Sequence, residues 1–234
     1  MMAQGKALGI LHLQSNSPEP AERLAAAGQL ASTVAEGMAL ALANLKLQET
    51  LRSQAIRDPL TGLFNRRYLI ESFERELARV RRQGLSLGVI MTDLDQFKKF
   101  NDTFGHDLGD KLLMAFSDFI STIIRKEDIA CRWGGEEFCL ILPGASLPAT
   151  LEKAEEIRSG VRQLQASNGQ PHRPVTISVG VAVYPEHGST RDELFIAADK
   201  AMYRAKNAGR DRVIPAQRMP GYHQDHPNQI SAVQ

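Results

Sequence analysis

The sequence has few cysteines, almost no net charge and no long apolar run, and each of these absences excludes something. Two cysteines in 234 residues are too few for a disulfide framework. A formal net charge of +1 gives no general electrostatic attraction to nucleic acid or to an anionic membrane surface. No apolar segment reaches the length of a membrane span, and the first residues do not have the pattern of a signal peptide. We therefore expect a cytoplasmic protein with no membrane span and no nucleic-acid partner.

The composition that remains is that of a folded globular protein. Apolar residues make up 43% of the chain and charged residues 24%, which is typical of one ordinary domain with an appendage. The two cysteines, Cys131 and Cys139, lie in apolar segments on either side of a Gly-Gly pair. Neighbouring strands could bring them close enough to form a bridge. Because no other cysteine is present, we expect two buried free thiols instead.

Residues 1–57 have the pattern of one strand followed by one long helix. Residues 5–14 read as the strand, and a helical pattern rich in Ala, Leu, Gln and Glu runs from Glu22 to Arg57. The helix is expected to stop at Asp58-Pro59, because a proline excludes the preceding residue from the helical region. One strand and one helix cannot bury a core. We therefore expect this segment to be the C-terminal end of a larger domain.

The helical segment carries two apolar series at alternating steps of four and three. They are Ala27, Ala31, Val34, Met38, Ala41 and Leu45, and Leu40, Asn44, Leu47 and Leu51. This spacing suits packing against a second helix. For the first series, packing against the rest of a preceding domain is an equally good interpretation. For Leu40–Leu51 we favour a parallel dimer stalk.

Residues 58–214 alternate between helical and strand patterns. Helices are expected over residues 66–84, 108–125, 147–165 and 191–209, strands over 85–95 and 174–185, and a hairpin over 128–142. This order predicts an α+β domain with a mostly antiparallel central sheet flanked by helices. Residues 215–234 are rich in Pro, Gln and His, and we expect a disordered tail.

Adjacent carboxylates occupy the expected hairpin turn, in the stretch RWGGEEFCLIL at residues 132–142. A hairpin with a solvated acidic tip is one interpretation. A second follows from Asp93, which ends an apolar strand and would approach Glu136 if that strand lies beside the hairpin. Two carboxylates at one site repel each other unless a cation lies between them. Mg²⁺ prefers oxygen ligands and completes its shell with substrate phosphates, so the pattern indicates a magnesium–nucleotide site.

Three further features favour a nucleotide. The Gly134–Gly135 pair has no Cβ atoms, so its backbone can come close to a ligand. Lys206 and Arg210 stand four residues apart at the end of the last expected helix, a spacing that puts both on one face to hold phosphates. Asn101 and Asp110 offer the planar polar groups that a purine base needs. Each feature is common by itself, and it is their combination on one fold that favours a nucleotide site.

The segment GGEEF at residues 134–138 is similar to the signature of the GGDEF-domain diguanylate cyclases, in which the third position is Asp or Glu. Four other segments resemble motifs of that family in the family's order. They are DPLTGLFNRR at 58–67, DLDQFKKFNDTFGHDLGD at 93–110, ISVGVA at 177–182 and ADKAMYRAKNAGRDRV at 198–213. The resemblance covers residues 56–214. Residues 1–57 resemble the C-terminal end of a GAF sensor domain followed by a stalk helix.

The resemblance implies a nucleotidyl cyclase, or polymerase-palm-like, fold and an enzyme that condenses two GTP into cyclic di-GMP and releases two pyrophosphates. Two domains would face each other with one GTP each, so it also implies a homodimer. Two Mg²⁺ ions would serve each active site, with Mn²⁺ as an alternative. A receptor that binds the nucleotide without turnover and a purely structural dimerisation module are the rival interpretations. The first usually has a broken signature, and the second leaves the acidic turn unexplained.

The resemblance also implies roles for individual residues. The metal ligands are Asp93, Glu136 and the backbone carbonyl of Leu94. Glu137 is the candidate for assisting deprotonation of the 3′-hydroxyl, with Glu136 as the alternative. The remaining site residues are Asn101, Asp110 and His106 at the guanine, Lys98, Lys206 and Arg210 at the phosphates, and Gly134 and Gly135 at the turn.

Arg125 and Asp128 form an R-x-x-D pair with the spacing of the family's inhibitory site for cyclic di-GMP. A solvated ion pair is the alternative interpretation. The guanidinium can bind guanine and phosphate acceptors, and the carboxylate can accept from guanine donors. Glu156 stands where many relatives carry a second arginine, so product inhibition is expected to be weaker or to need another basic residue such as Arg158.

Overall fold

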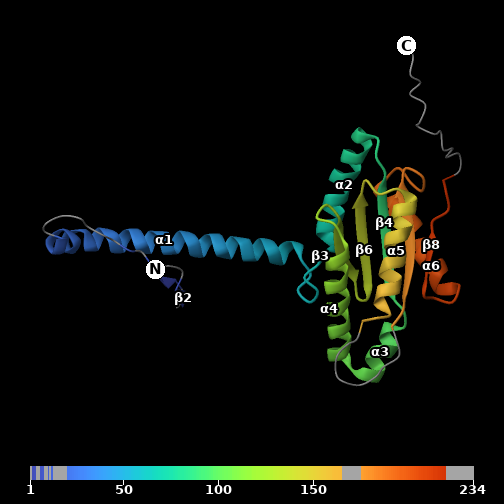
Figure 1. Cartoon of the computed structure of the whole chain (residues 1–234), viewed down its shortest axis with the longest axis horizontal. Coiled ribbons are helices and arrows are strands. Elements are labelled where there is room, and N and C mark those ends of the chain that lie inside the picture. The colour runs from blue at the N-terminus through green and yellow to red at the C-terminus, as the bar shows by residue number, and fades with distance from the viewer. Residues whose placement is uncertain are drawn as a thin grey trace, which may run out of the picture. The chain divides into compact units, whose positions relative to one another are not determined.

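The structure is a computed structural model in which residues 2–3, 6–7, 10, 12, 20–164 and 175–219 are described. It divides into two units, Met1–Ala55 and Ile56–Gln234 (Figure 1). The first unit contains two short antiparallel strands and one long helix. They are β1 (Met2–Ala3), β2 (Lys6–Ala7) and α1 (Pro20–Ile56). The single strand expected over residues 5–14 lies mostly outside the described residues.

Helix α1 has 37 residues and agrees with the expected helix to within two residues at its start and one at its end. Many of its described apolar side chains are exposed. They include Leu30, Val34, Met38, Leu40, Leu45 and Leu47, whereas the side chain of Leu51 lies outside the described residues. Apolar surface of this extent is typical of an interaction site. No helix in the described part of the chain is both long enough and apolar enough to cross a membrane.

The second unit is built on a mixed sheet of six strands in the order β3-β5-β6-β4-β7-β8. In that order the strands are β3 (Phe64–Asn65), β5 (Ile129–Gly134), β6 (Glu137–Pro143), β4 (Leu87–Leu94), β7 (Ile177–Tyr184) and β8 (Arg212–Pro215). The inner pairings are antiparallel, and only the edge strands β3 and β8 pair in parallel. The predicted α+β fold is confirmed.

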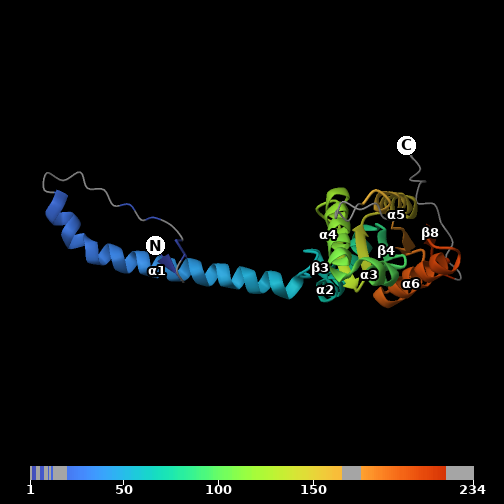
Figure 2. The ribbon, with the colours of Figure 1, turned by 90° about the horizontal axis from the view of Figure 1, so that it is seen from below.

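The sheet lies between two layers of helices, as Figure 2 shows. The helices are α2 (Arg66–Gln83), α3 (Phe97–Phe104), α4 (His106–Ile123), α5 (Leu147–Val161) and α6 (Arg191–Asn207). Helices α3, α4 and α5 bury apolar side chains against one face of the sheet, and α2 and α6 bury theirs against the other. Both faces of the central strands are therefore covered, which explains why every residue of β4 is buried.

Helix α6 packs directly on the backbone of β7 at Gly180. A Cβ atom at Gly180 would collide with the carbonyl oxygen of Ala198 and the amide nitrogen of Met202. Only glycine permits this close approach. The N-terminus of α6 is fixed by a capping box, in which Thr190 and Glu193 exchange hydrogen bonds with each other's backbone amides. The helix that carries Lys206 is thus held firmly on the sheet.

Cys131 and Cys139 lie directly opposite each other on β5 and β6. Both are buried free thiols, as the sequence predicts. Burial raises the pKa of Cys131 to about 12, and it raises that of Cys139 well above its usual value. Neither thiol is therefore a reactive thiolate at neutral pH.

Candidate functional site

The end of β4 brings the predicted acidic residues together. Asp93 pairs with Glu137 of β6 on one side and with Ser178 of β7 on the other. The amide of Leu94 donates to the carbonyl oxygen of Glu136 at 3.2 Å. The strand that carries Asp93 therefore lies beside the hairpin. It is Glu137, rather than Glu136, that stands directly across from Asp93.

Lys206 of helix α6 is a basic residue that contacts this group of acidic side chains. The Nζ atom of Lys206, in the last turn of α6, lies 2.7 Å from Oδ2 of Asp93. Burial nevertheless raises the pKa of Asp93, and the charges of Glu136 and Asp95 add to this rise while Lys206 opposes it. Burial and the charge of Asp93 likewise raise the pKa of Glu137. One ammonium does not neutralise this group, so a further cation would be stabilised here.

The turn between β5 and β6 presents bare backbone next to these carboxylates. Gly135 has a φ of 48°, a left-handed conformation that favours glycine. Gly134 is different, because its φ is not positive and a Cβ atom there would meet nothing within 4 Å. Neither local strain nor packing requires glycine at position 134. Its missing side chain leaves space outside the turn.

A polar cluster that includes Asp58 of the DPLTG segment braces this turn. Nε of Arg132 donates to the carbonyl oxygen of Gly135 at 2.9 Å, and its Nη1 lies 3.3 Å from Oδ1 of Asp58. The same oxygen of Asp58 accepts from the amide and the hydroxyl of Thr61 at 2.9 and 2.7 Å. Although burial acts to raise it, these hydrogen bonds and the charge of Arg132 lower the pKa of Asp58. The sequence shows the motif at residues 58–67 but does not predict that Asp58 and Arg132 brace the turn.

The predicted base-binding residues lie where α3 meets α4. Gly105, with a φ of 88°, joins the two helices and donates to the carbonyl oxygen of Asn101 at 2.8 Å. The Oδ1 atom of Asn101 is buried and has no hydrogen-bond partner among the described residues. A Cβ atom at Gly109 would collide with this oxygen, so Asn101 lies against the turn that carries Asp110. An unpaired buried acceptor is costly, and a ligand donor would satisfy it.

Lys98, His106 and Asp110 are exposed on the same pair of helices. Arg210 is also exposed and, within the described residues, its guanidinium makes no ion pair. The expectation that Lys206 and Arg210 share one helical face is wrong, because α6 ends at Asn207. Arg210 lies in the following turn with a left-handed φ of 62°. The two cations thus come from different local structures.

The residues at the end of β4 fit a magnesium site that is completed by its substrate. In the part of the chain that the structure describes, no three His, Cys, Asp or Glu side chains are grouped so as to hold a metal ion. Asp93, Glu136 and the carbonyl of Leu94 offer two carboxylates and one backbone oxygen around one strand end. Mg²⁺ in phosphate-transfer sites usually takes one or two carboxylates and keeps water and phosphate as its other ligands.

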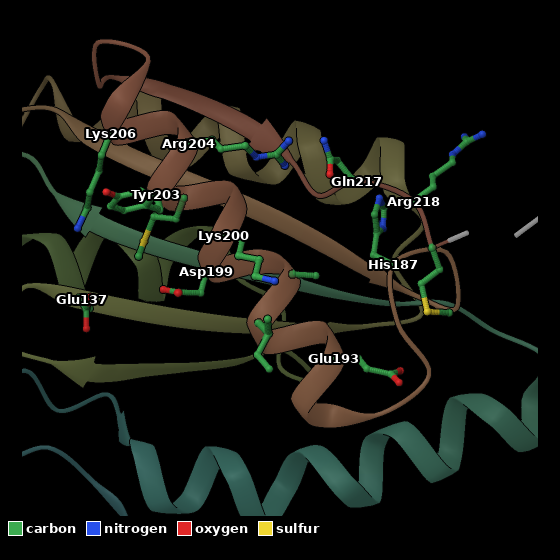
Figure 3. A pocket seen from close by; sticks show the side chains of 14 residues that line it. Glu137, His187, Glu193, Asp199, Lys200, Tyr203, Arg204, Lys206, Gln217 and Arg218 are labelled. Carbon is green, nitrogen blue, oxygen red and sulfur yellow. The ribbon is translucent and has the colours of Figure 1, made fainter. Parts of the chain in front are cut away.

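A groove of about 990 Å³ runs along α6 from this site. Figure 3 shows Glu137 and Lys206 at one end of the groove and His187 and Arg218 at the other. The exposed side chain of Tyr203 lies on the helix between them. The groove therefore meets the predicted site at Glu137 and Lys206.

The R-x-x-D pair lies in the segment between α4 and β5. The backbone amide of Arg125 donates to Oδ2 of the buried Asp128 at 2.8 Å, and burial raises the pKa of Asp128. Among the described residues the guanidinium of Arg125 is exposed and makes no ion pair, so the two are not a solvated ion pair. Both residues line a cavity of about 320 Å³ together with Arg57 and Lys126.

Glu156, the departure from the family pattern, is itself neutralised. Its Oε2 atom lies 2.5 Å from Nζ of Lys153, which also donates to the carbonyl oxygen of Ile123 at 2.6 Å. Arg158 is already engaged, because it binds Glu155 at 2.7 Å and Asp211 at 2.9 Å. The charge of Glu156 is therefore met by Lys153 and not by Arg158.

Comparison with known proteins gives consistent matches over the second unit. The family model described as "Diguanylate cyclase, GGDEF domain" matches residues 55–212. The response regulator PleD of Caulobacter vibrioides is 40% identical over 162 residues, which are 68% of this chain and 36% of PleD. The diguanylate cyclase DosC of Escherichia coli is 40% identical over 168 residues, which are 71% of this chain and 36% of DosC. The chain thus spans about a third of the length of these curated relatives.

A solved structure extends the similarity beyond the second unit. The coiled coil and GGDEF domain of DgcB from Caulobacter crescentus, in complex with c-di-GMP, has a TM-score of 0.71 at 29% identity. The match covers 80% of this chain and 99% of the DgcB chain.

Proposed function

Because this chain belongs to the family of GGDEF-domain diguanylate cyclases, we propose that it condenses two molecules of GTP into cyclic di-GMP and releases two pyrophosphates. The observation that carries the proposal is the end of β4, where Asp93 lies opposite Glu137 and against Lys206. The glycine turn beside it gives a nucleotide access to that group. A receptor without turnover is the second candidate, and the complete signature argues against it.

The acidic residues divide into metal ligands and a base. Asp93, Glu136 and the carbonyl of Leu94 would hold Mg²⁺, with Mn²⁺ as an alternative. When bound, two such ions would lower the pKa of the attacking hydroxyl and stabilise the leaving pyrophosphate. Glu137 is our candidate for the general base, because it lies across from Asp93 beside the proposed metal ligands and lines the groove along α6. Glu136 remains the alternative.

The substrate would lie beside the glycine turn, with one group of polar residues at its phosphates and a second group at its base. Lys98, Lys206 and Arg210 would neutralise the phosphates, and His106 lies on the same helix as Asp110. A carboxylate at Asp110 can accept from N1–H and N2–H of guanine together, whereas adenine has an acceptor at N1. The unpaired oxygen of Asn101 supports the same base assignment.

Catalysis would require a homodimer. One domain holds one GTP, so two domains must face each other for each 3′-hydroxyl to attack the partner's α-phosphate. The exposed apolar residues of α1 support a parallel stalk between two chains. The similarity to the coiled coil of DgcB supports it too. We also propose that residues 1–57 combine the end of a GAF-like domain with this stalk, that 58–214 form the cyclase domain, and that 215–234 form a tail.

Product inhibition through Arg125 and Asp128 is part of the same proposal. Asp128 is held by the backbone of Arg125, which leaves the guanidinium for guanine or phosphate. The pair between Lys153 and Glu156 removes the repulsion that an acid at position 156 would otherwise exert on the product.

The decisive experiment is GTP turnover with Mg²⁺, measured as pyrophosphate and cyclic di-GMP over a range of protein concentrations. We expect activity to rise faster than linearly with dilute protein until dimers saturate. ATP should be rejected by roughly 10⁴-fold, since the site would leave its acceptors unpaired. GTP binding without pyrophosphate would favour the receptor. Comparable rates with ATP would contradict the base assignment.

A further inference from the structure

Asp95 is a buried carboxylate that none of the roles proposed above uses. It follows Asp93 by two residues, and only 7% of its surface is exposed. Its Oδ2 and Oδ1 atoms accept from the hydroxyls of Thr176 at 2.7 Å and Ser178 at 2.6 Å. Oδ2 also accepts from the backbone amide of Asp211 at 3.1 Å. The carboxylate is therefore fully occupied in joining β4 to β7 and to the turn after α6.

That turn holds three consecutive residues in left-handed conformations. The φ angles are 106° at Gly209, 62° at Arg210 and 46° at Asp211. For the two residues that are not glycine, this conformation costs about 1–3 kcal/mol each and persists only where the surroundings enforce it. The amide of Arg210 donates back to the carbonyl oxygen of Ala205 at 3.0 Å, which closes the end of α6.

The side chain of Asp211 anchors the turn from the other layer of helices. Its carboxylate binds Arg158 of α5 at 2.9 Å and also binds Arg162, the residue that follows α5. The amide of Asp211 thus donates to Asp95, which follows β4, and the carboxylate of Asp211 binds two guanidinium groups at the C-terminal end of α5. Both connections act on the residue immediately after Arg210.

We propose that Asp95, Asp211 and Arg158 are positioning residues that hold this turn so that Arg210 faces the substrate's triphosphate. None of the three would touch the nucleotide. The proposal rests on the assignment of GTP as substrate, and it explains why two non-glycine residues adopt a strained backbone at this point. A plain structural anchor would stabilise the fold equally whether or not position 210 is an arginine.

A double-mutant cycle with Arg210 separates these two roles. The probe is 3′-deoxy-GTP with Mg²⁺, which lacks the attacking hydroxyl, and the readout is its equilibrium affinity. Asp95→Leu keeps the branching of the side chain but removes both acceptor oxygens, including the one that binds the Asp211 amide. We expect it to weaken binding about tenfold in the wild-type background, the size of a lost charge-assisted contact. In the Arg210→Ala background it should weaken binding no further. Equal losses in both backgrounds would overturn the proposal.

Arg158→Gln offers a second route if Asp95→Leu lowers the melting temperature too far for binding to be measured. It removes one guanidinium from Asp211 at the surface of α5 and should follow the same pattern against Arg210→Ala. Glu155→Gln is the matched control, because it breaks only the Glu155–Arg158 pair and should leave the affinity unchanged. A wild-type protein that does not bind 3′-deoxy-GTP contradicts the proposed function itself. A binding protein whose variants act additively contradicts only the positioning role.

Discussion

Two turns flank the end of β4, and they achieve left-handed backbone in opposite ways. The hairpin turn uses Gly135, with a φ of 48°, and exposes bare backbone. The turn after α6 places Arg210 and Asp211 in the same region of conformational space although both carry side chains. The first turn is locally relaxed, whereas the second depends on anchors from β4 and α5.

The difference follows from what each turn must present. The hairpin turn presents space and backbone, and glycine supplies both. The α6–β8 turn presents a guanidinium on one residue and a carboxylate on the next, so glycine would remove the side chains on which the proposed roles depend. Strain is therefore tolerated where side-chain chemistry is required and avoided where access is required.

The largest expected effect lies in the acidic group beside the hairpin turn. Asp93→Asn or Glu136→Gln should lower cyclic di-GMP formation by at least about 10³-fold, because each removes a charge that would hold the metal ions. The domain should stay folded, since neither carboxylate is required for a backbone conformation. Circular dichroism and a turnover assay check this. A folded variant that retains a tenth of the wild-type rate would contradict the metal assignment.

Substitutions at the two glycines of the hairpin turn should distinguish the space needed by the nucleotide from backbone strain. Gly134→Ala adds a methyl group in open space, so stability should hold while activity falls by about 10²-fold through displacement of the nucleotide. Gly135→Ala should in addition cost about 1 kcal/mol of unfolding free energy, because alanine is strained at positive φ. Chemical denaturation and initial rates measure both. Equal stability losses in the two variants would show that space is not the reason for Gly134.

Arg210→Gly should make the α6–β8 turn resemble the hairpin turn. Relief of left-handed strain, about 1–2 kcal/mol, is partly offset by the greater freedom of glycine in the unfolded chain, which leaves a gain of about 0.5 kcal/mol. GTP affinity should fall at the same time. Arg210→Ala is the control, since it loses the guanidinium but keeps the strain. If Arg210→Gly proves no more stable than Arg210→Ala in denaturation, the strain has been misjudged.

The smallest effect concerns the brace of the hairpin turn and depends on pH. Because the pKa of Asp58 is lowered in the folded state, its contribution to stability is present above the ordinary value of 3.8 and is lost as the pH falls through the folded value. Asp58→Asn should therefore lower the melting temperature at pH 6 by more than at pH 3. A constant difference between the two proteins across this range would exclude an electrostatic role for Asp58.

The long elements could be predicted because their patterns are local. The amphipathic spacing of α2, the continuous apolar run of β4 and the capping glycine at Gly84 lie within single segments. Helix α3 was missed because it is short and begins after Gln96, which has a left-handed φ of 58°. Strands β3 and β8 were missed because they are short and exist only by pairing with β5 and β7.

The site could be predicted as a set of residues but not as an arrangement. Motif order identified Asp93 and the glutamates, yet register alone decides that Glu137 is the one across from Asp93. The spacing of four residues between Lys206 and Arg210 predicts one helical face, but α6 ends at Asn207 and residues 209–211 adopt left-handed conformations. The contact made by Asp95 could not be predicted, because its partner Asp211 lies more than a hundred residues later in the chain.

The contact of α6 with Gly180 of β7 sets how close the Lys206 side chain comes to Asp93. Lys206 lies one helical turn beyond Met202, whose backbone rests against the bare α-carbon of Gly180. A single methyl group at this point would lift the helix and draw the ammonium away from Asp93. The packing of α6 on the centre of the sheet therefore fixes the distance between Lys206 and Asp93.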